Sequence, residues 1–309
     1  MAEIKPVETE VLVIGGGIAG IRAAIESHDR GTEVTLVNKG ALAQDGAATW
    51  MAGLGHEVAL YPPDSVEVHA EDCIVAGKYL GNQELIYTLL KLGSQNLNEL
   101  WKWGVRFPRD DKGRFLRYHL PGHTYARSMS HRHHNVPGKG FRGPELRQAL
   151  AHQIRRRKIK VMEDLFITDL LTRDNTVVGA VGIDLSDGEF KVVKAKSTIL
   201  ATGGYMCCYR YLTAGNASTG DGHAIAYRAG AKLMDMEFIQ FLITGLWPPS
   251  VQGGSTPFDY ILLFSGWLLN NKAERFMERY SPEGKEWTRR EVLFNAIASE
   301  FAWHLGSCF

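Results

Sequence analysis

The fold can be predicted from one segment near the N-terminus, Glu10-Val-Leu-Val-Ile-Gly-Gly-Gly-Ile-Ala-Gly-Ile-Arg-Ala-Ala-Ile-Glu26. Its aliphatic start predicts a buried strand, and its second half predicts a helix. Between them, Gly15, Gly17 and Gly20 fill the three places of G-x-G-x-x-G. After a strand and before a helix, this motif provides a tight turn, a close approach of backbone to pyrophosphate, and close packing of helix on strand. The stretch therefore predicts a dinucleotide cradle; the alternative is a structural glycine turn.

A second strand, Val34-Thr-Leu-Val37, follows at the distance that a βαβ unit requires, so we expect an α/β, Rossmann-like fold with a parallel sheet. The acidic residue that usually binds the ribose hydroxyls at the end of this strand is replaced by Asn38, followed by Lys39. An amide oxygen can still accept a hydrogen bond from a ribose hydroxyl, but without a full negative charge. The replacement disfavours NAD and favours FAD, whose contacts are spread over a longer cofactor.

Composition limits the possible partners. The chain has 309 residues, 45% hydrophobic and 22% charged, as in a soluble globular protein of one large domain or two. Its net charge of +1 gives no overall field to attract nucleic acid or an anionic membrane. The basic run Arg155-Arg-Arg-Lys158 stands where a helix is expected to end, and there it complements the helix dipole. Because no long apolar run and no signal-peptide pattern is present, we expect a cytoplasmic chain without a direct membrane span.

Two patterns bear on metal binding. The four cysteines show no C-x-x-C spacing, so we expect neither a structural zinc nor a cluster bound by this chain: Cys73, Cys207, Cys208 and Cys308. Residues 114–142 are rich in His but contain no Asp or Glu, which metal sites use to orient their histidines: His119, His123, His131, His133 and His134. We therefore predict no metal site and interpret this segment as an anion-facing or flavin-facing loop.

Residues 159–200 alternate as in a β-meander, with turns predicted at 173–176 and 186–188. The segment ends in Ser197-Thr-Ile-Leu-Ala-Thr-Gly-Gly204, a predicted buried strand running into a second glycine turn. In flavoproteins with two dinucleotide motifs such a strand follows a meander, so this turn is either a second cofactor contact or a plain turn. A long packing helix is predicted from Asn82 to Trp101, and another is predicted to open at Pro144.

Residues 218–241 carry a specific family resemblance. Ser218-Thr-Gly-Asp-Gly-His-Ala-Ile-Ala-Tyr-Arg-Ala-Gly-Ala-Lys-Leu-Met-Asp-Met-Glu-Phe-Ile-Gln-Phe241 resembles the flavoprotein subunits of succinate dehydrogenase and fumarate reductase, with their relatives L-aspartate oxidase and adenylylsulfate reductase. Asn270-Asn-Lys-Ala-Glu-Arg-Phe-Met-Glu-Arg-Tyr-Ser-Pro282 looks like a segment of the family's capping domain. The glycine cradle, the Asn38-Lys39 pair, where the family often has Ser-Lys, and Ala201-Thr-Gly-Gly204 fit the same pattern. The resemblance covers nearly the whole chain.

The resemblance implies an FAD-binding domain over residues 1–241 and a partial α+β capping domain over 242–309. It also implies the residues that bind FAD. The pyrophosphate would lie on the first glycine turn, at Gly15, Gly17 and Gly20, and the adenosine ribose would lie near Asn38 and Lys39. The adenine end would lie near the later glycine turn, at Ala201, Thr202 and Gly203. Asp221, in the Thr-Gly-Asp-Gly turn, would be one further flavin contact. A plain turn cap is the alternative role of Asp221.

Three departures from the family pattern bear on chemistry. Gly46 stands where many relatives link flavin covalently to a His, so FAD is expected to be non-covalent. Leu242-Ile-Thr244 replaces His-Pro-Thr, and Leu262-Leu-Phe-Ser-Gly-Trp-Leu268 replaces Thr-Glu-x-x-Arg-Gly-Glu-Gly, which removes an imidazole and a carboxylate suited to proton relay. Arg290 matches the family's catalytic arginine, and Arg289 is the alternative by one register.

The family continues well beyond the point where this sequence ends, so the chain looks truncated. By the resemblance we expect an FAD-dependent oxidoreductase that acts on a small-molecule substrate and passes electrons to a separate iron–sulfur subunit, with any membrane association made through a partner. Two alternatives stay open: an adenylylsulfate-reductase-like subunit with a sulfur substrate, and a non-catalytic flavoprotein fragment. Fold alone does not decide among them, because chemistry depends on the site.

Overall fold

A computed structural model describes residues 5–44, 46–47, 54–130, 144–210, 212, 217–241 and 266–304. The chain divides into two units, each made of two separate stretches. Unit 1 comprises Met1–Ala52 and Gly140–Ile239, and unit 2 comprises Gly53–Lys139 and Gln240–Phe309. This division differs from the continuous 1–241 domain implied by the resemblance. The strands before residue 38 pair with strands after residue 159, which leaves the intervening residues to group with the C-terminal stretch.

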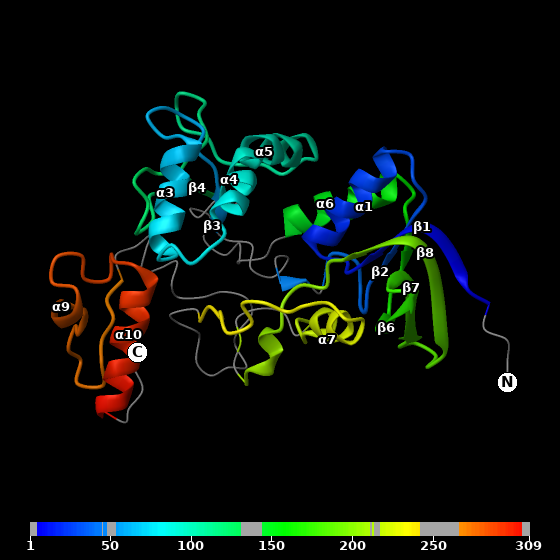
Figure 1. Cartoon of the computed structure of the whole chain (residues 1–309). Coiled ribbons are helices and arrows are strands. Elements are labelled where there is room, and N and C mark those ends of the chain that lie inside the picture. Colours follow the sequence, from blue (N-terminus) through cyan, green and yellow to red (C-terminus); the bar gives the residue numbers. More distant parts are fainter. Residues whose placement is uncertain are drawn as a thin grey trace. The chain divides into compact units, whose positions relative to one another are not determined.

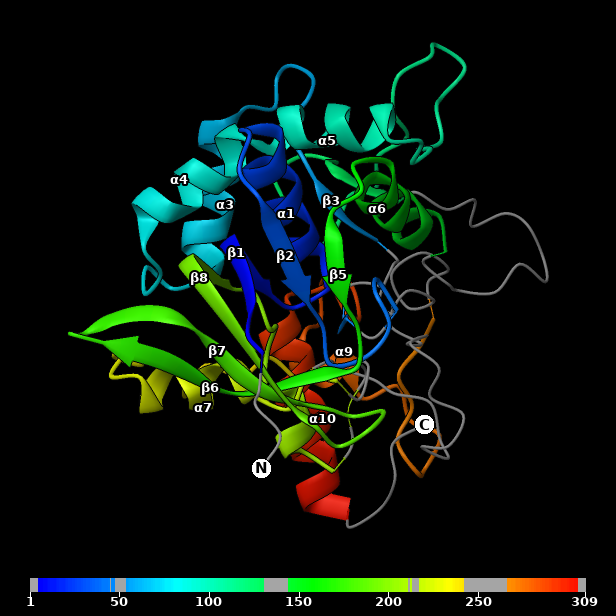
Figure 2. The ribbon, with the colours of Figure 1, turned by 90° about the vertical axis from the view of Figure 1, so that its right-hand side faces the viewer.

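Unit 1 is built on a six-stranded sheet of order β5-β2-β1-β8-β7-β6 (Figures 1 and 2). The strands are β1 (Val7–Ile14), β2 (Val34–Val37), β5 (Lys160–Met162), β6 (Leu165–Arg173), β7 (Thr176–Asp184) and β8 (Phe190–Leu200). The first four in this order are parallel, and β7 is antiparallel to both of its neighbours. The predicted α/β fold, with a parallel sheet and a β-meander, is confirmed.

Strand β8 belongs to both parts of this sheet. Its first half pairs with β7 in the meander, and its residues 193–200 pair with β1, so that Leu200 lies opposite Ile14. The sequence predicted the strand but not this neighbour. The pairing brings the second glycine turn beside the first, and Ala201 donates its N–H to the carbonyl oxygen of Ile14 at 2.8 Å. The carboxyl ends of parallel strands are where ligands bind in such sheets.

The described helices of unit 1 include α1 (Ile18–Asp29), α6 (Pro144–Arg156) and α7 (Asp221–Arg228), with the short 3₁₀ helix η1 (Met206–Cys208). In Figure 1, α1 and α6 lie on one side of the sheet and α7 lies on the other, beside β6. The helix predicted to open at Pro144 is confirmed, and its apolar stripe is buried: Leu146, Leu150 and Ile154.

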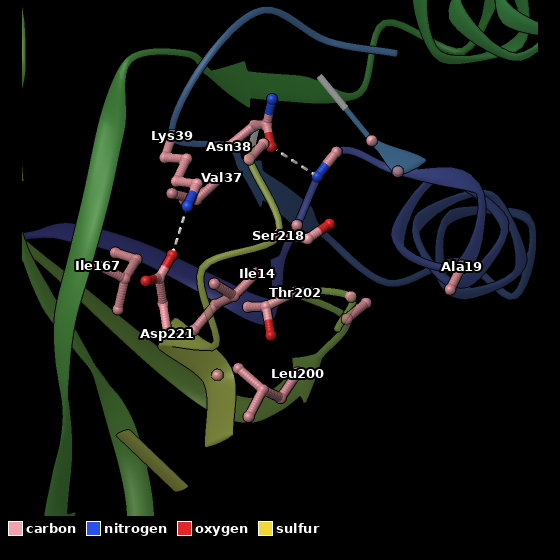
Figure 3. A pocket seen from close by; sticks show the side chains of 18 of the residues that line it. Ile14, Ala19, Val37, Asn38, Lys39, Ile167, Leu200, Thr202, Ser218 and Asp221 are labelled. Carbon is pink, nitrogen blue, oxygen red and sulfur yellow. Dashed lines mark hydrogen bonds and ion pairs between the residues drawn. The ribbon is translucent and has the colours of Figure 1, made fainter. Parts of the chain in front are cut away.

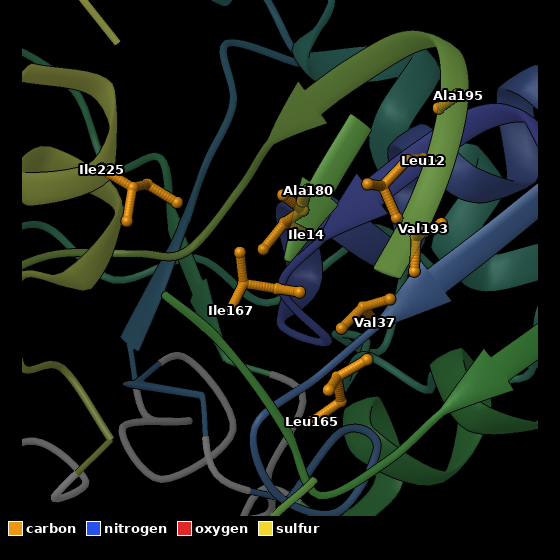
Figure 4. Packing of buried hydrophobic residues seen from close by; sticks show 9 residues of the cluster. All are labelled: Leu12, Ile14, Val37, Leu165, Ile167, Ala180, Val193, Ala195 and Ile225. Carbon is orange, nitrogen blue, oxygen red and sulfur yellow. The ribbon is translucent and has the colours of Figure 1, made fainter. Parts of the chain in front are cut away.

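The meander covers the face of the parallel strands that α1 leaves open. Figure 4 shows the resulting cluster of buried side chains from the parallel strands, the meander and α7: Leu12, Ile14, Val37, Leu165, Ile167, Ala180, Val193, Ala195 and Ile225. Full burial of one of the larger members contributes about 1.5–3 kcal/mol. Since Ile225 belongs to α7, this core fixes the helix that follows the Thr-Gly-Asp-Gly turn against β1 and β6.

Unit 2 contains an antiparallel strand pair, β3 (Leu54–Glu57) with β4 (Ser128–Ser130), and the helices α3 (Val66–Ala76), α4 (Gln83–Lys91), α5 (Gly93–Lys102), α9 (Met277–Tyr280) and α10 (Arg290–His304). One core cluster joins its two stretches of chain: Leu120, Leu268, Phe276, Met277, Leu293 and Ala296. Leu268, from the apolar segment that replaces the family's acidic motif, is therefore a core residue.

The prediction of one packing helix from Asn82 to Trp101 is wrong. Asn82 does cap the start, because its Oδ1 accepts the N–H of Leu85 at 3.0 Å. However, α4 ends at Lys91 and α5 begins at Gly93, a residue of low helix propensity that packs against Val58. The apolar positions of α4 do not form a buried stripe, since Leu85 is 67% exposed.

Arg127, in the polar segment after Arg114, is buried inside unit 2. Arg127 is fully buried, and its guanidinium bonds to both carboxylate oxygens of Asp64 and, at 2.6 Å, to Asp72 on α3. Thr124 donates to the same Asp72 through its N–H and its hydroxyl. The carboxylates that the segment itself lacks are thus supplied by residues fifty or more positions earlier, so the anions that Arg127 faces are side chains of this chain.

Candidate cofactor-binding site

A cavity of about 680 Å³ lies at the carboxyl ends of the parallel strands of unit 1 (Figure 3). Its wall comes from the first glycine turn, the ends of β2 and β8, the start of β6, and α7. It contains eight of the nine residues predicted to bind FAD: Gly15, Gly17, Asn38, Lys39, Ala201, Thr202, Gly203 and Asp221. Gly20 is not in the wall. Arg290 belongs to unit 2, where it is the first residue of α10.

The three motif glycines have three different surroundings. Gly15 has φ +120°, and a Cβ there would lie 2.2 Å from the carbonyl oxygen of Ala201. A Cβ on Gly20 would lie 1.8 Å from the carbonyl oxygen of Gly15. Around Gly17, by contrast, a Cβ would meet no atom of the described residues within 4 Å, although the residue lines the cavity. Only Gly15 and Gly20 are required by the protein's own packing; Gly17 leaves space beside the cavity, which is what a pyrophosphate against the backbone needs.

Helix α1 presents its N-terminus to the same place. It begins at Ile18, with Gly17 as the N-cap and no side chain capping the first turn. The amide groups at the start of a helix, with the positive end of the helix dipole, form a favourable site for phosphate. The chemistry of this edge therefore fits the pyrophosphate of a dinucleotide.

Asn38 is in the cavity wall, but its side-chain amide points into the protein. Its Oδ1 accepts the N–H of Gly16 at 2.9 Å (Figure 3). Its Nδ2 donates to the carbonyl oxygens of Gly40 at 2.8 Å and Ala41 at 3.1 Å. Both amide hydrogens are thus used within the chain. A hydrogen bond from a ribose hydroxyl to Asn38 stays a prediction, and these partners within the chain could not be predicted from the sequence.

Lys39 and Asp221 form an ion pair in the cavity wall. Lys39 Nζ lies 2.6 Å from Oδ2 of Asp221 (Figure 3). It also donates to the hydroxyl of Thr219, which donates to Oδ1 of the same carboxylate at 2.7 Å. The carboxylate is not a cap of α7, whose N-cap is Gly220 with no side-chain hydrogen bond. Asp221 is the first residue of α7, so this pairing lies at the positive end of the helix dipole, and the cofactor role and the turn-cap role of Asp221 both stay predictions.

Several wall residues were not predicted from the sequence. The start of β6, Leu165 to Ile167, lines the cavity, and Lys39 lies 5.9 Å from the centre of the Phe166 ring. A meander strand carries no signal for such a role. Gly222 had a signal, since it follows the acid of the Thr-Gly-Asp-Gly turn, and a Cβ there would lie 1.8 Å from the hydroxyl of Thr202.

Gly46 also lies in the wall, where a Cβ would be 3.2 Å from the Cα of Gly17. The sequence places no side chain at this position that could bond to flavin. The other departures, Leu242-Ile-Thr244 and residues 262–265, lie outside the described residues, as do His131, His133 and His134. In the part of the chain that the structure describes, no three His, Cys, Asp or Glu side chains gather closely enough to hold a metal ion. Nor does any described helix have the length and apolarity needed to cross a membrane.

Comparison with known proteins agrees with this geometry. Residues 10–307 match the protein family described as FAD binding domain. The chain is 36% identical over 297 residues to a fumarate reductase (CoM/CoB) subunit of Methanothermobacter marburgensis, covering 95% of this chain and 52% of that protein. It is 30% identical over 292 residues to the succinate dehydrogenase flavoprotein subunit of Rickettsia bellii, covering 94% of this chain and 48% of that protein. The chain thus spans about half the length of these relatives.

A solved structure shows the same arrangement. Sdh1 from Mycobacterium smegmatis superposes with a TM-score of 0.81 at 32% identity, over 98% of this chain and 51% of that one. Because the family match extends over nearly the whole chain and the glycine cradle fits a pyrophosphate, FAD is the cofactor of this fold, and the chain belongs to the FAD binding domain family, similar to the N-terminal portion of fumarate reductase and succinate dehydrogenase flavoprotein subunits.

Proposed function

We propose that this chain is the FAD-binding part of an oxidoreductase flavoprotein subunit that passes electrons between a small substrate and an iron–sulfur partner. The observation that carries the proposal is the contrast among the motif glycines. A Cβ on Gly15 or Gly20 would collide with backbone atoms, whereas a Cβ on Gly17 would meet no atom of the described residues and would lie beside the cavity. Packing among the described residues gives no reason for a glycine at position 17, whereas a bound pyrophosphate does.

The described residues have separate tasks in this function. The amide groups at the start of α1 bind the pyrophosphate, since this helix end has no side-chain cap. Lys39 and Asp221 offer a cation and an anion to the adenosine portion. Apolar wall residues such as Leu200 and Ile225 exclude water. Bound FAD supplies hydride chemistry at its flavin ring.

FAD is held without a covalent bond in this proposal, because Gly46 provides no nucleophile at the position where many relatives carry the linking His. In unit 2, Arg290 is the candidate for binding or protonating an anionic substrate, with Arg289 as the alternative. An arginine suits this task because its planar guanidinium binds carboxylates through two parallel hydrogen bonds.

Gly17→Asp tests the cofactor site with two readouts of opposite sign. Asp is a favoured N-cap and Gly17 already has extended backbone angles, so the apoprotein should keep or slightly raise its melting temperature. The new carboxylate would face the pyrophosphate, so FAD affinity, measured by quenching of flavin fluorescence, should fall at least tenfold. Repulsion between two charges about 4 Å apart near a protein surface reaches about 4 kcal/mol.

Gly81→Asp is the matched control, because it makes the same exchange at an exposed loop position of unit 2 and should leave FAD affinity within about twofold. Failure of the wild-type chain to bind FAD, or equal affinity in Gly17→Asp, would contradict the proposed site.

A further inference from the structure

The residue at the end of β2 is turned away from the cavity that it borders. Asn38 is the first residue after this strand, where dinucleotide-binding folds place the acid that contacts ribose. Its side chain instead connects two loops. Oδ1 accepts from Gly16 in the glycine turn (Figure 3), and Nδ2 donates to Gly40 and Ala41 in the loop that follows β2. The donors and acceptors decide this orientation, because an N–H faces the oxygen and two carbonyl groups face the nitrogen.

The backbone of Asn38 is occupied as well. Its N–H donates to the carbonyl oxygen of Met162 at 2.9 Å, and its carbonyl oxygen accepts the N–H of Leu165 at 3.0 Å. All three N–H hydrogens of Asn38 are therefore bonded within the chain, and the residue has no donor left for a ligand.

The contact with Asn38 requires a residue without a side chain at position 16. A Cβ on Gly16 would lie 2.7 Å from Cγ of Asn38, which is closer than packed side chains approach. The carbonyl oxygen of Gly16 in turn accepts the N–H of Ala43 at 3.1 Å. Gly16 is outside the three-glycine fingerprint, and this packing explains why a glycine is present there. The middle of the turn is thus held from both sides by residues 38–43.

On this basis we propose that Asn38 is a positioning residue for FAD binding: it braces the glycine turn through Gly16 and does not contact the ribose. The inference rests on the proposed FAD site. It predicts that an acid at position 38, which would improve a ribose contact, impairs binding here. A carboxylate can still accept from Gly16, but it would face the carbonyl oxygens of Gly40 and Ala41 and could donate to neither.

Asn38→Asp separates the two roles because they predict opposite changes. If Asn38 is a brace, the dissociation constant for FAD rises at least tenfold, and Asn38→Ala weakens binding to a similar degree. If Asn38 contacts the ribose, Asn38→Asp binds FAD as tightly as the wild type or more tightly, and that result would overturn the inference. Asn175→Asp makes the same exchange on the exposed turn between β6 and β7 and should change affinity less than twofold.

Amide hydrogen exchange of the wild-type apoprotein tests, without any variant, whether Asn38 holds the Gly16 N–H before FAD binds. A brace protects the Gly16 N–H before FAD is added, by at least a hundredfold relative to an unstructured peptide, and FAD adds little further protection. Rapid exchange of Gly16 in the apoprotein, with protection only after FAD binds, would refute the brace. This readout also separates the two proposals: a chain that binds no FAD but protects Gly16 removes the proposed function and leaves the brace in place.

Discussion

The ammonium group of Lys39 lies 2.6 Å from the carboxylate of Asp221, so one ion pair ties the end of β2 to the first residue of α7. The two side chains are 26% and 21% exposed, which places the pair between a surface contact and a buried one. Removing one partner of such a pair leaves a poorly solvated charge, whereas removing both does not.

We therefore expect Lys39→Met and Asp221→Asn each to lower the stability of unit 1, and the double variant to lose less than their sum. A coupling free energy of about 1 kcal/mol is expected for a half-buried pair. Urea unfolding of the apoproteins measures it. Strict additivity of the two single changes would show that the contact contributes nothing.

Acid should destabilise unit 2 through His69. This side chain is 2% exposed, and burial lowers its pKa to about 4, with the positive charge of Arg127 acting in the same direction and Asp64 and Asp72 opposing it. An unfolded His binds a proton near its usual pKa of 6.5, whereas the folded one stays neutral until about pH 4. The contribution of neutral His69 to the free energy of unfolding is thus complete above pH 6.5. It is lost as the pH falls toward 4, at about 1.4 kcal/mol per pH unit.

His69→Gln should flatten the dependence of unfolding free energy on pH in this window, measured by chemical denaturation at several pH values. The exposed His152 on α6 provides the control exchange, His152→Gln. An unchanged slope in His69→Gln would place the acid sensitivity elsewhere.

Flavin should be released intact from this protein. With Gly46 in place of a linking His, precipitation of the FAD-loaded chain with acid should leave the yellow colour in the supernatant. Colour retained in the pellet would demonstrate a covalent bond and contradict the assignment at position 46.

Activity toward the family's dicarboxylates should be negligible. The segments 242–244 and 262–268 lack the His and Glu of the family pattern, and charge-assisted hydrogen bonds contribute roughly 1.5–3 kcal/mol each. Losing two costs about 3–6 kcal/mol, or about 10²- to 10⁴-fold in rate. Fumarate reduction by the FAD-loaded chain, assayed with a reduced dye, at about 10 per second would refute this expectation.

If another anionic substrate is used, Arg290→Lys should sharply reduce turnover in an active complex while the flavin absorption spectrum stays the same, because lysine lacks the planar fork of arginine. Equal turnover would remove Arg290 from the proposed site and leave Arg289 to be tested by the same exchange.

Local patterns predicted the parts of unit 1 that depend on neighbours in sequence. The strand before Gly15, the helix after Gly17 and the meander turns follow from periodicity and glycine placement, and the structure has them. The features that the sequence did not predict depend on distant partners. The inward orientation of Asn38 requires Gly16, and the burial of Arg127 requires Asp64 and Asp72. No local pattern specifies such pairings, since a polar side chain can face either solvent or a partner brought by the fold.

The pairing of β1 with β8 also determines when the sheet can form during translation. Val7 on β1 pairs with Val193 on β8, so β1 emerges from the ribosome long before its partner exists. At roughly 5–20 residues per second, the wait is on the order of ten seconds or more. During that interval one edge of β1 has no strand beside it, and Gly15 lacks the Ala201 carbonyl against which it packs. A nascent chain arrested before residue 190 should therefore expose the unpaired backbone edge of β1 to chaperones, and the complete cavity can form only after β8 and α7 have been synthesised.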